Sequence, residues 1–551
     1  MSIPRPDART MVGPLAVLLI VTSLIVTGLG VAGPSANAGA AQATPVASAA
    51  ATPVLPASRI DVSHGVASGD VTATGAVIWA RASSGPAQMH VEYGTDPAFA
   101  APQRADSAPG AAEVATDLTA TLPLADLTPD SRYHYRVWFT DGGGTSGPPT
   151  IGATTGSFRT APAPGSRRPV AFTVAGDIAG QQYCRRSDEG YRMFARMEVL
   201  QPDFVIGNGD MIYADTACPV DGPVEGFTDW TNVPGDFPSI ANPEVDWTDL
   251  ARVREIYDEH WRYNRADPHF QRFLRSTPLY AQWDDHEVIN DFGAEWEFWN
   301  QANRDRPGYP NLVTAGRDSF FDWNPIARDA EEPNRIYRSF DWGADMELFL
   351  LDARSYRTRN DREGVAPGAE TILGAEQRDW LQQGLLDSAA TWKIVSSDVP
   401  LSIPTGSNAK EFGRDAFATG TDPEVPTETG YEAELADLLR YLDDNDVENV
   451  VFVVMDVHFA MTLRYETDAN GDGDMLVFHE LISGPNNAIA VPPPDPDPTF
   501  NPTVLYSEGD LFNFQYVRLE PAADGTTHLI ADVRDEEGLA RPGSLLDVAP
   551  R

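Results

Sequence analysis

The stretch 203-DFVIGNGD-210 places a short apolar run directly before an aspartate, and repetition of this pattern decides the fold. The other five runs are 170-VAFTVAGD-177, 278-PLYAQWDD-285, 346-MELFLLD-352, 392-WKIVSSD-398 and 450-VVFVVMD-456. The runs are short, rich in β-branched or aromatic residues and largely without alternation, which is typical of strands buried on both faces. We therefore predict six buried strands, each followed by an aspartate.

Helix-like segments separate these runs. Residues 189–200, 375–386 and 432–442 carry apolar side chains near helical spacing. Alternation of strands with helices predicts a layered α/β domain, here placed over residues 163–551. Ligands of such sheets bind at the carboxyl ends of the strands, so we expect the aspartates to gather at one rim.

These aspartates predict a metal cluster. A single aspartate after a strand is an ordinary turn residue, but here six recur in one domain and His286 and His458 lie directly within two of the motifs. Carboxylates gathered at one rim repel one another unless cations neutralise them. Carboxylate, imidazole and phenolate ligands suit iron, manganese, zinc or calcium. Two such metals can hold a phosphoryl group and activate a hydroxide.

Residues 59–162 have a different character. Met89, Val91 and Tyr93 alternate with polar neighbours, and turn residues separate short strand-like runs. The segment 127-LTPDSRYHYRV-137 is similar to the tyrosine corner of fibronectin type III-like domains. We predict a small β-sandwich of that type in front of the α/β domain.

The composition excludes some partners. The chain of 551 residues has 81 acidic and 40 basic residues, for a formal charge of −41. Its length predicts two or three domains. So acidic a surface repels nucleic-acid backbones and anionic lipids, so neither is expected to be a primary partner.

The N-terminus predicts export. Arg5 and Arg9 precede an apolar run over residues 11–31, and 36-ANA-38 offers a cleavage site. We predict a signal peptide over residues 1–38, a flexible linker over residues 39–58 and no stable membrane span after cleavage; a retained anchor is the alternative. An exported chain whose two cysteines are Cys184 and Cys218 predicts one disulfide between them.

Several motifs together resemble the PhoD-like alkaline phosphatase and phospholipase D family of metallophosphoesterases. They are 64-HGVASGDVTATGAVIWAR-81, 207-GNGDMIYAD-215, 282-QWDDHEVIND-291, 350-LLDARSYR-357 and 455-MDVHF-459. The resemblance implies a metallophosphatase-type sandwich of mixed sheets flanked by helices. It also implies a secreted enzyme that hydrolyses phosphate mono- or diesters with Fe³⁺ and Ca²⁺, Zn²⁺ or Mn²⁺ being the alternatives. A phospholipid-type diester is a further possible substrate.

The resemblance assigns the iron ligands. Asp210 is expected to bridge two metals, and Tyr213 to give a phenolate to a ferric ion that Asp456 and His458 also bind. The remaining ligand falls at Asp177, where the family commonly has a cysteine. A carboxylate is a harder ligand than a thiolate, so this exchange can alter the metal that binds.

The second metal is expected to bind Asp210 and Asp285, with Asp284 as the alternative ligand. A metal-held hydroxide then attacks phosphorus, because metal binding lowers the pKa of water from about 15.7 toward 7.

The remaining expected roles belong to His286, Asn290 and Arg354. His286 follows a metal ligand and is expected to protonate the leaving oxygen or stabilise developing charge. Asn290 and Arg354 are expected to contact phosphate oxygens. A loop cap is the alternative for Asn290, and an ion-pair partner is the alternative for Arg354.

A further calcium site is predicted in 468-DANGDGD-474. Asp468, Asn470 and Asp472 take positions 1, 3 and 5 of an EF-hand-type loop, but position 12 falls on His479. A polar hairpin is the alternative.

Two alternative functions remain. A phospholipase D-like phosphodiesterase differs only in substrate, whereas a catalytically inactive secreted binding module would keep the fold alone. The leading sandwich favours the binding module, and the nearly complete set of metal motifs favours an enzyme.

Overall fold

The computed structural model describes residues 59–141, 153–222, 230–293, 306–358, 370–405, 415–418 and 430–551. The expected signal peptide over residues 1–38 and linker over residues 39–58 lie outside these ranges. All described residues belong to one compact unit, Val54–Arg551. Within them, no helix is long and apolar enough to cross a membrane.

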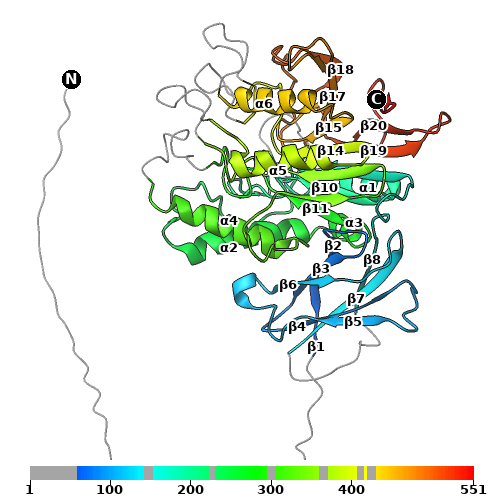
Figure 1. The fold of residues 1–551 in the computed structure, drawn as a ribbon. Helices are drawn as coiled ribbons and strands as arrows, with labels where there is room; N and C mark the ends of the chain where they lie inside the picture. Colours follow the sequence, from blue (N-terminus) through cyan, green and yellow to red (C-terminus); the bar gives the residue numbers. More distant parts are fainter. Residues whose placement is uncertain are drawn as a thin grey trace, which may run out of the picture. The chain divides into compact units, whose positions relative to one another are not determined.

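The first eight strands form the predicted small sandwich (Figure 1). One layer contains β2 (Val62–Gly69), β3 (Ala76–Ala82) and β6 (Thr119–Leu124). The other contains β1 (Arg59–Ile60), β4 (Gln88–Gly94), β5 (Gln103–Asp106), β7 (Arg132–Thr140) and β8 (Thr154–Arg159). The backbone amide of Thr128 donates to the hydroxyl of Tyr133 over 2.9 Å, which is the hydrogen bond of the predicted tyrosine corner.

All six predicted strands are present, and each ends just before its aspartate. In a nine-stranded sheet, β9 (Val170–Ala175), β10 (Phe204–Asn208) and β11 (Leu279–Gln282) are parallel neighbours. In a seven-stranded sheet, β13 (Met346–Leu350), β14 (Trp392–Ser397) and β15 (Val450–Val454) are parallel neighbours. Because parallel strands end on the same side, each sheet carries its aspartates along one edge.

The remaining strands complete the two sheets. They are β12 (Arg338–Asp341), β16 (Ala460–Thr467), β17 (Leu476–Ile482), β18 (Pro502–Glu508), β19 (Asn513–Pro521), β20 (Thr527–Asp535) and β21 (Leu546–Val548). The strand orders are β21-β20-β19-β9-β10-β11-β2-β3-β6 and β12-β13-β14-β15-β17-β16-β18. Strand β2 pairs with β11 at Gly69 and Leu279, so one layer of the sandwich continues the nine-stranded sheet.

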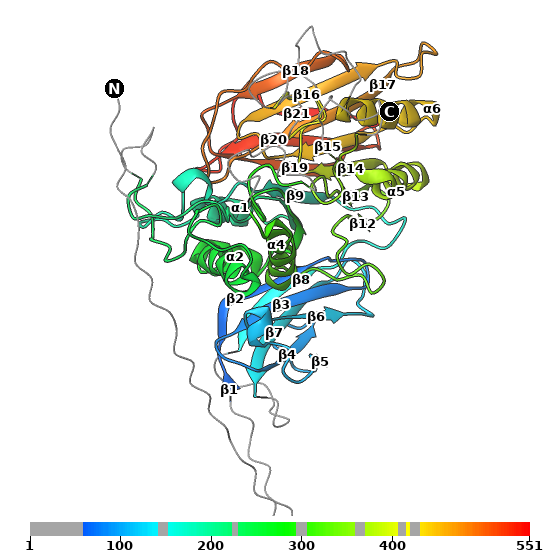
Figure 2. The same ribbon diagram turned by 90° about the vertical axis from the view of Figure 1, so that its left-hand side faces the viewer.

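Helices cover the outer faces of both sheets (Figure 2). They are α1 (Arg192–Leu200), α2 (Leu250–Arg265), α3 (Pro268–Leu274), α4 (Tyr309–Trp323), α5 (Gly374–Asp387) and α6 (Tyr431–Asp444). One apolar cluster lies under α1–α4, a second between the two sheets and a third under α5 and α6. The layered α/β prediction is confirmed. Helices α1, α5 and α6 were expected from apolar spacing, whereas α2 and α4 were not.

One buried carboxyl group stands away from the strand-end aspartates. Glu480 of β17 is fully buried, and its oxygens accept hydrogen bonds from the Leu401 amide, over 2.7 Å, and from the Tyr465 hydroxyl. Burial raises the pKa of Glu480 from 4.5 to about 7, although the Leu401 amide opposes this shift. Below about pH 7, Glu480 is therefore protonated and neutral in the folded protein.

We expect Glu480→Gln to flatten the dependence of stability on pH. As pH rises through about 4.5, the unfolded chain releases this proton first, so the folded state loses stability until about pH 7. A glutamine cannot ionise, so the variant gains about 3 kcal/mol relative to wild type across this interval. Urea unfolding at several pH values measures the difference. Glu244→Gln, exposed in the loop before α2, is the control and leaves the curve unchanged; parallel curves for Glu480→Gln and wild type would contradict the expectation.

Candidate metal centre

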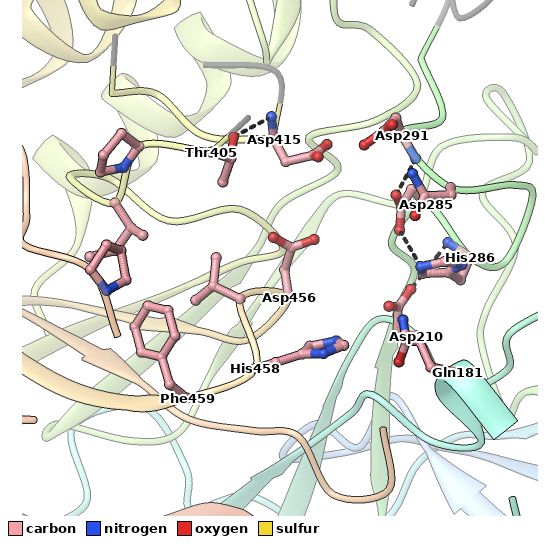
Figure 3. Close-up of a pocket in the computed structure, with 15 residues that line it drawn as sticks. Gln181, Asp210, Asp285, His286, Asp291, Thr405, Asp415, Asp456, His458 and Phe459 are labelled. Atoms are coloured by element: carbon pink, nitrogen blue, oxygen red, sulfur yellow. Dashed lines mark hydrogen bonds and ion pairs between the residues drawn. The ribbon is translucent and has the colours of Figure 1, made fainter. Parts of the chain in front are cut away.

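A cavity of about 310 Å³ opens where the aspartates of the two sheets meet. Its lining residues are of two chemical kinds. The acidic lining consists of carboxylates and imidazoles: Asp210, Asp285, His286, Asp291, Asp415, Asp456 and His458. The apolar lining consists of Ile403, Pro404, Val457, Phe459 and Pro494. Figure 3 shows Asp456 and His458 on the side of Phe459, across the cavity from Asp210 and His286.

The backbone at the strand-end aspartates adopts an uncommon conformation. Asp177, Asp210, Asp456 and His458 have φ of 51°, 51°, 72° and 63°, in the left-handed region. Such residues cost conformational energy and cluster at functional sites. Gly209, with φ of 86°, is required between β10 and β11, because a Cβ atom there would lie 2.3 Å from Cβ of Asp284. The strand ends can therefore approach one another closely.

Two groups of possible ligands share Asp210. Donor atoms of Asp177, Asp210 and His458 lie within 4.8 Å of one another, and so do those of Asp210, Asp285 and His286. The Tyr213 hydroxyl lies 2.9 Å from Nε2 of His458. Asp210 thus occupies the position that a residue bridging two metals needs.

Two further groups enlarge the cluster. Asp456, expected as an iron ligand together with Asp177, lies beside it through its backbone amide, and its carboxylate groups with those of Asp284 and Asp285. Asp285 also groups with Asp291 and Asp415. Asp284 and Asp285 are therefore both available as ligands, and the sequence alone offered no reason to include Asp291 or Asp415.

The carboxylates in these groups lack partners that a cation would supply. Oδ2 of Asp284 and Oδ1 of Asp285 are buried and accept no hydrogen bond from any described residue, and among these residues the buried Asp177 carboxylate has only the Asp456 backbone amide beside it. Burial, with neighbouring carboxylates, raises the pKa of Asp177, Asp210 and Asp284 well above the usual range. Unpaired buried oxygens are costly, so this donor set fits metal ions.

Arg354 makes the closest ion pairs behind the acidic lining, and Arg357 adds a longer one to Asp415, at 3.6 Å. Arg354 is fully buried, and its Nε, Nη1 and Nη2 contact Asp284, Asp415 and Asp456 over 2.5, 2.5 and 3.0 Å. The expected contact with a phosphate oxygen therefore gives way to the alternative, an ion-pair partner. A single guanidinium offsets the repulsion of three carboxylates from separate segments.

His286 lines the cavity and is held by Asp215. Its Nδ1 lies 2.6 Å from Asp215, and its ring stacks on Tyr213 with centroids 4.0 Å apart. Burial lowers the pKa of His286, but the carboxylates of Asp215, Asp285 and Asp210 outweigh it and raise that pKa well above its usual value. Asp215 belongs to the motif 207–215, yet its sequence context alone suggested no role.

Asn290 lies at the exposed rim of the cavity. Its backbone amide donates to Asp215 over 3.0 Å, which joins the rim to the His286 pair. Glu287 is a second residue whose role the sequence did not reveal. Its carboxylate accepts hydrogen bonds from the amides of Asp210, Met211 and Asp284 over 2.7–2.9 Å, so it joins the loops after β10 and β11.

The predicted disulfide is confirmed. Cys184 and Cys218 are bonded, with Cα atoms 5.8 Å apart. Each cysteine follows a ligand-bearing loop, one after Asp177 and the other after Asp210. The bond therefore limits how far these two loops can separate.

The 468–474 segment forms an exposed loop between β16 and β17, which pair as an antiparallel hairpin. Asp468, Asn470 and Asp472 accept hydrogen bonds from the amides of Gly471, Asp472 and Asp474. These bonds are those of a polar hairpin loop, and calcium binding at this loop stays a prediction.

Two packed mixed sheets with Asp and His side chains grouped at their strand ends have the arrangement of a two-metal hydrolase centre. The chain belongs to the PhoD-like phosphatase family: its profile matches residues 172–515, and the profile of the PhoD-like phosphatase N-terminal domain matches residues 47–162. Alkaline phosphatase D of Bacillus subtilis (strain 168) is 24% identical over 457 residues, covering 77% of this chain and 70% of that relative. The protein is thus a phosphoesterase rather than an inactive binding module.

Solved structures share this fold. A structure of PhoD superposes with a TM-score of 0.62 and 19% identity, covering 89% of this chain and 92% of the other. A purple acid phosphatase from yellow lupin (Lupinus luteus) seeds superposes with a TM-score of 0.54 and 13% identity, covering 89% and 74%. Both confirm the metallophosphatase-type architecture.

We expect Arg354→Gln to lower the free energy of unfolding by about 3–5 kcal/mol in chelator, because the buried carboxylates lose their counter-charge. Added divalent cations narrow this gap by replacing the lost charge. Arg335→Gln is the matched control, since Arg335 forms surface ion pairs with Asp329 and Glu332. We expect this variant to lower the free energy of unfolding by less than about 1 kcal/mol. Equal losses in the two variants would refute the role given to Arg354.

Proposed function

We propose that the protein is a secreted, metal-dependent phosphoesterase of the alkaline phosphatase D type that hydrolyses phosphate mono- or diesters. The observation that carries this proposal is the pair of ligand groups sharing Asp210 at an open cavity. Family membership supplies the reaction class. The predicted leader and the disulfide support export, since disulfides persist in oxidising compartments.

Asp177, Asp210, Tyr213, Asp456 and His458 would hold the Fe³⁺. Asp210 and Asp285 would hold the Ca²⁺, with Asp284 available as a further ligand; Zn²⁺ or Mn²⁺ are the alternatives. The bound ions supply Lewis acidity, which polarises the phosphoryl oxygens and makes hydroxide available as the nucleophile near neutral pH. Oxygen-rich ligand groups support hard or borderline cations.

His286 is the proposed proton donor to the leaving oxygen. Its Nδ1 is engaged by Asp215, so its Nε2, 3.9 Å from Asp285, remains at the cavity side for the leaving group. The Asp215 carboxylate raises the pKa of His286 and so favours the protonated imidazole that a general acid needs. Asn290 at the rim is the proposed contact for a phosphate oxygen.

A phospholipase D-like phosphodiesterase is the second candidate. The apolar lining of the cavity favours this candidate, because a diester carries a second organic group that needs an apolar surface to bind. The lining residues concerned are Ile403, Pro404, Val457, Phe459 and Pro494.

The activity test compares p-nitrophenyl phosphate with bis(p-nitrophenyl) phosphate. We expect wild type to hydrolyse at least one, and chelation to abolish the activity. Asp210→Asn lowers kcat/KM by at least about a hundredfold, because both ligand groups lose a shared carboxylate. Asp329→Asn, on the surface, leaves it unchanged. Full activity in Asp210→Asn would overturn the proposal, and the ratio of the two substrates separates the two candidates.

Elemental analysis with an absorption spectrum tests the metal assignment. We expect iron near one per chain, calcium beside it, and a visible charge-transfer band that disappears in Tyr213→Phe because the phenolate is lost. Tyr257→Phe, a buried tyrosine whose hydroxyl donates to the Val288 carbonyl, is the matched control and keeps the band. Zinc or manganese without a band would reject iron while leaving the phosphoesterase proposal intact.

A further inference from the structure

The described residues that line the cavity offer little positive charge to an anionic substrate. None of these described residues is a lysine or an arginine. Arg354, behind the acidic lining, is fully buried and paired with carboxylates. Arg357 is also buried, and its Nη1 lies 3.6 Å from Asp415. A phosphoryl group carries several non-bridging oxygens that accept hydrogen bonds, so neutral donors in the cavity lining can help to bind it.

Gln181 is such a donor, and its loop is tightly held. It lies in the turn Gly180–Gln182 after β9 and lines the cavity near Asp210 (Figure 3). Its φ of 44° is left-handed, as are those of the flanking Ala179 and Gln182. Gly180 makes the close approach possible, because a Cβ atom there would lie 2.7 Å from the Tyr213 ring. The turn that carries Gln181 therefore packs closely against Tyr213 in a strained backbone conformation, and this places Gln181 in the cavity lining.

The direction of the Gln181 amide is fixed by a hydrogen bond. The backbone amide of Ile489 donates to Oε1 of Gln181 over 3.1 Å. Only the carbonyl oxygen of a glutamine side chain can accept, so Nε2 must occupy the other position. No described residue accepts a hydrogen bond from that nitrogen. Because Ile489 also bonds through its backbone to His458, the Gln181 side chain is anchored beside the ligand groups.

We propose that Gln181 is a substrate-binding residue whose side-chain amide donates a hydrogen bond to a non-bridging oxygen of the phosphoryl group. This inference rests on the proposed function and adds a residue to it. A neutral donor here holds the oxyanion without adding a cation that would compete with metal ions for the carboxylates. A purely structural role, in which Gln181 only anchors Ile489, is the rival explanation.

Gln181→Glu separates the two explanations. Glutamate keeps an oxygen that accepts from the Ile489 amide, so the loop remains anchored, but it replaces the donor with a negatively charged oxygen. Gln182→Glu is the matched control, because it adds the same charge in the same turn at a side chain that does not line the cavity. Gln181→Met removes the donor without adding charge.

The measurement is inhibition of the metal-loaded enzyme by inorganic phosphate, alongside KM for p-nitrophenyl phosphate or bis(p-nitrophenyl) phosphate. A hydrogen bond to a charged group is worth about 10- to 100-fold in affinity. We therefore expect Gln181→Glu to raise the inhibition constant and KM by at least about tenfold, and Gln181→Met to raise both by less. Gln182→Glu stays within about twofold of wild type, and all three keep the wild-type Tm and metal content.

Three outcomes would overturn the inference. If Gln181→Glu and Gln182→Glu behave alike, the donor does not meet phosphate. If Gln181→Glu and Gln181→Met instead lower Tm or metal content, the residue is structural. If wild type hydrolyses neither ester and is not inhibited by phosphate, the proposed function itself fails, which the first two outcomes leave standing.

Discussion

Repulsion among carboxylates buried at the rim of the two sheets is the constraint on which the rest of the structure depends. Asp177, Asp210 and Asp284 are almost completely removed from water, where an ionised carboxylate without a partner is very costly. Arg354 offsets part of this cost by pairing with Asp284. The Glu287 carboxylate accepts hydrogen bonds from the backbone amides of Asp210 and Asp284 and so joins the two loops. The oxygens that remain unpartnered among the described residues need protons, water or metal ions to stabilise them.

The surrounding fold is what keeps these groups from separating. Parallel strands buried between apolar layers fix where each loop begins, and the Cys184–Cys218 bond joins two of those loops beyond their ligands. The left-handed backbone at Asp177, Asp210 and Asp456 is an energetic cost that an isolated loop would relax. The sheets thus hold ligands in a geometry that local sequence preferences oppose.

Sequence patterns predicted this rim because its main determinant is local. An apolar run followed by aspartate can be recognised without knowing what lies opposite. The partners of Arg354 could not be predicted in this way, since Asp284 and Asp415 lie 70 and 61 positions away. For the same reason Asp215 and Glu287 gained their roles only from tertiary proximity.

The helices show the same limit. Helices α5 and α6 carry apolar residues at regular spacing, whereas α2 buries polar side chains such as Asp258, His260 and Asn264 among its apolar ones. Asp258 is paired with Arg254 and with Ser319 of α4. Apolar residues such as Val253, Ile256 and Trp261 nevertheless recur at helical spacing in α2, so its sequence pattern indicates a helix. The pairing of its buried polar side chains is what the sequence does not indicate, because Ser319 lies 61 positions from Asp258.

Charge finally links substrate binding to metal binding. The chain carries a formal charge of −41, and its cavity is lined by five aspartates, so an empty site repels an anion. Cations in the ligand groups reverse the local field. Phosphate affinity must then depend on metal occupancy, and by linkage phosphate must in turn retain the metals. Neutral donors such as the Gln181 amide fit this coupling, because they orient the oxyanion whichever cation is bound. A lysine or arginine at the same position would instead repel the metal ions and lower their binding affinity.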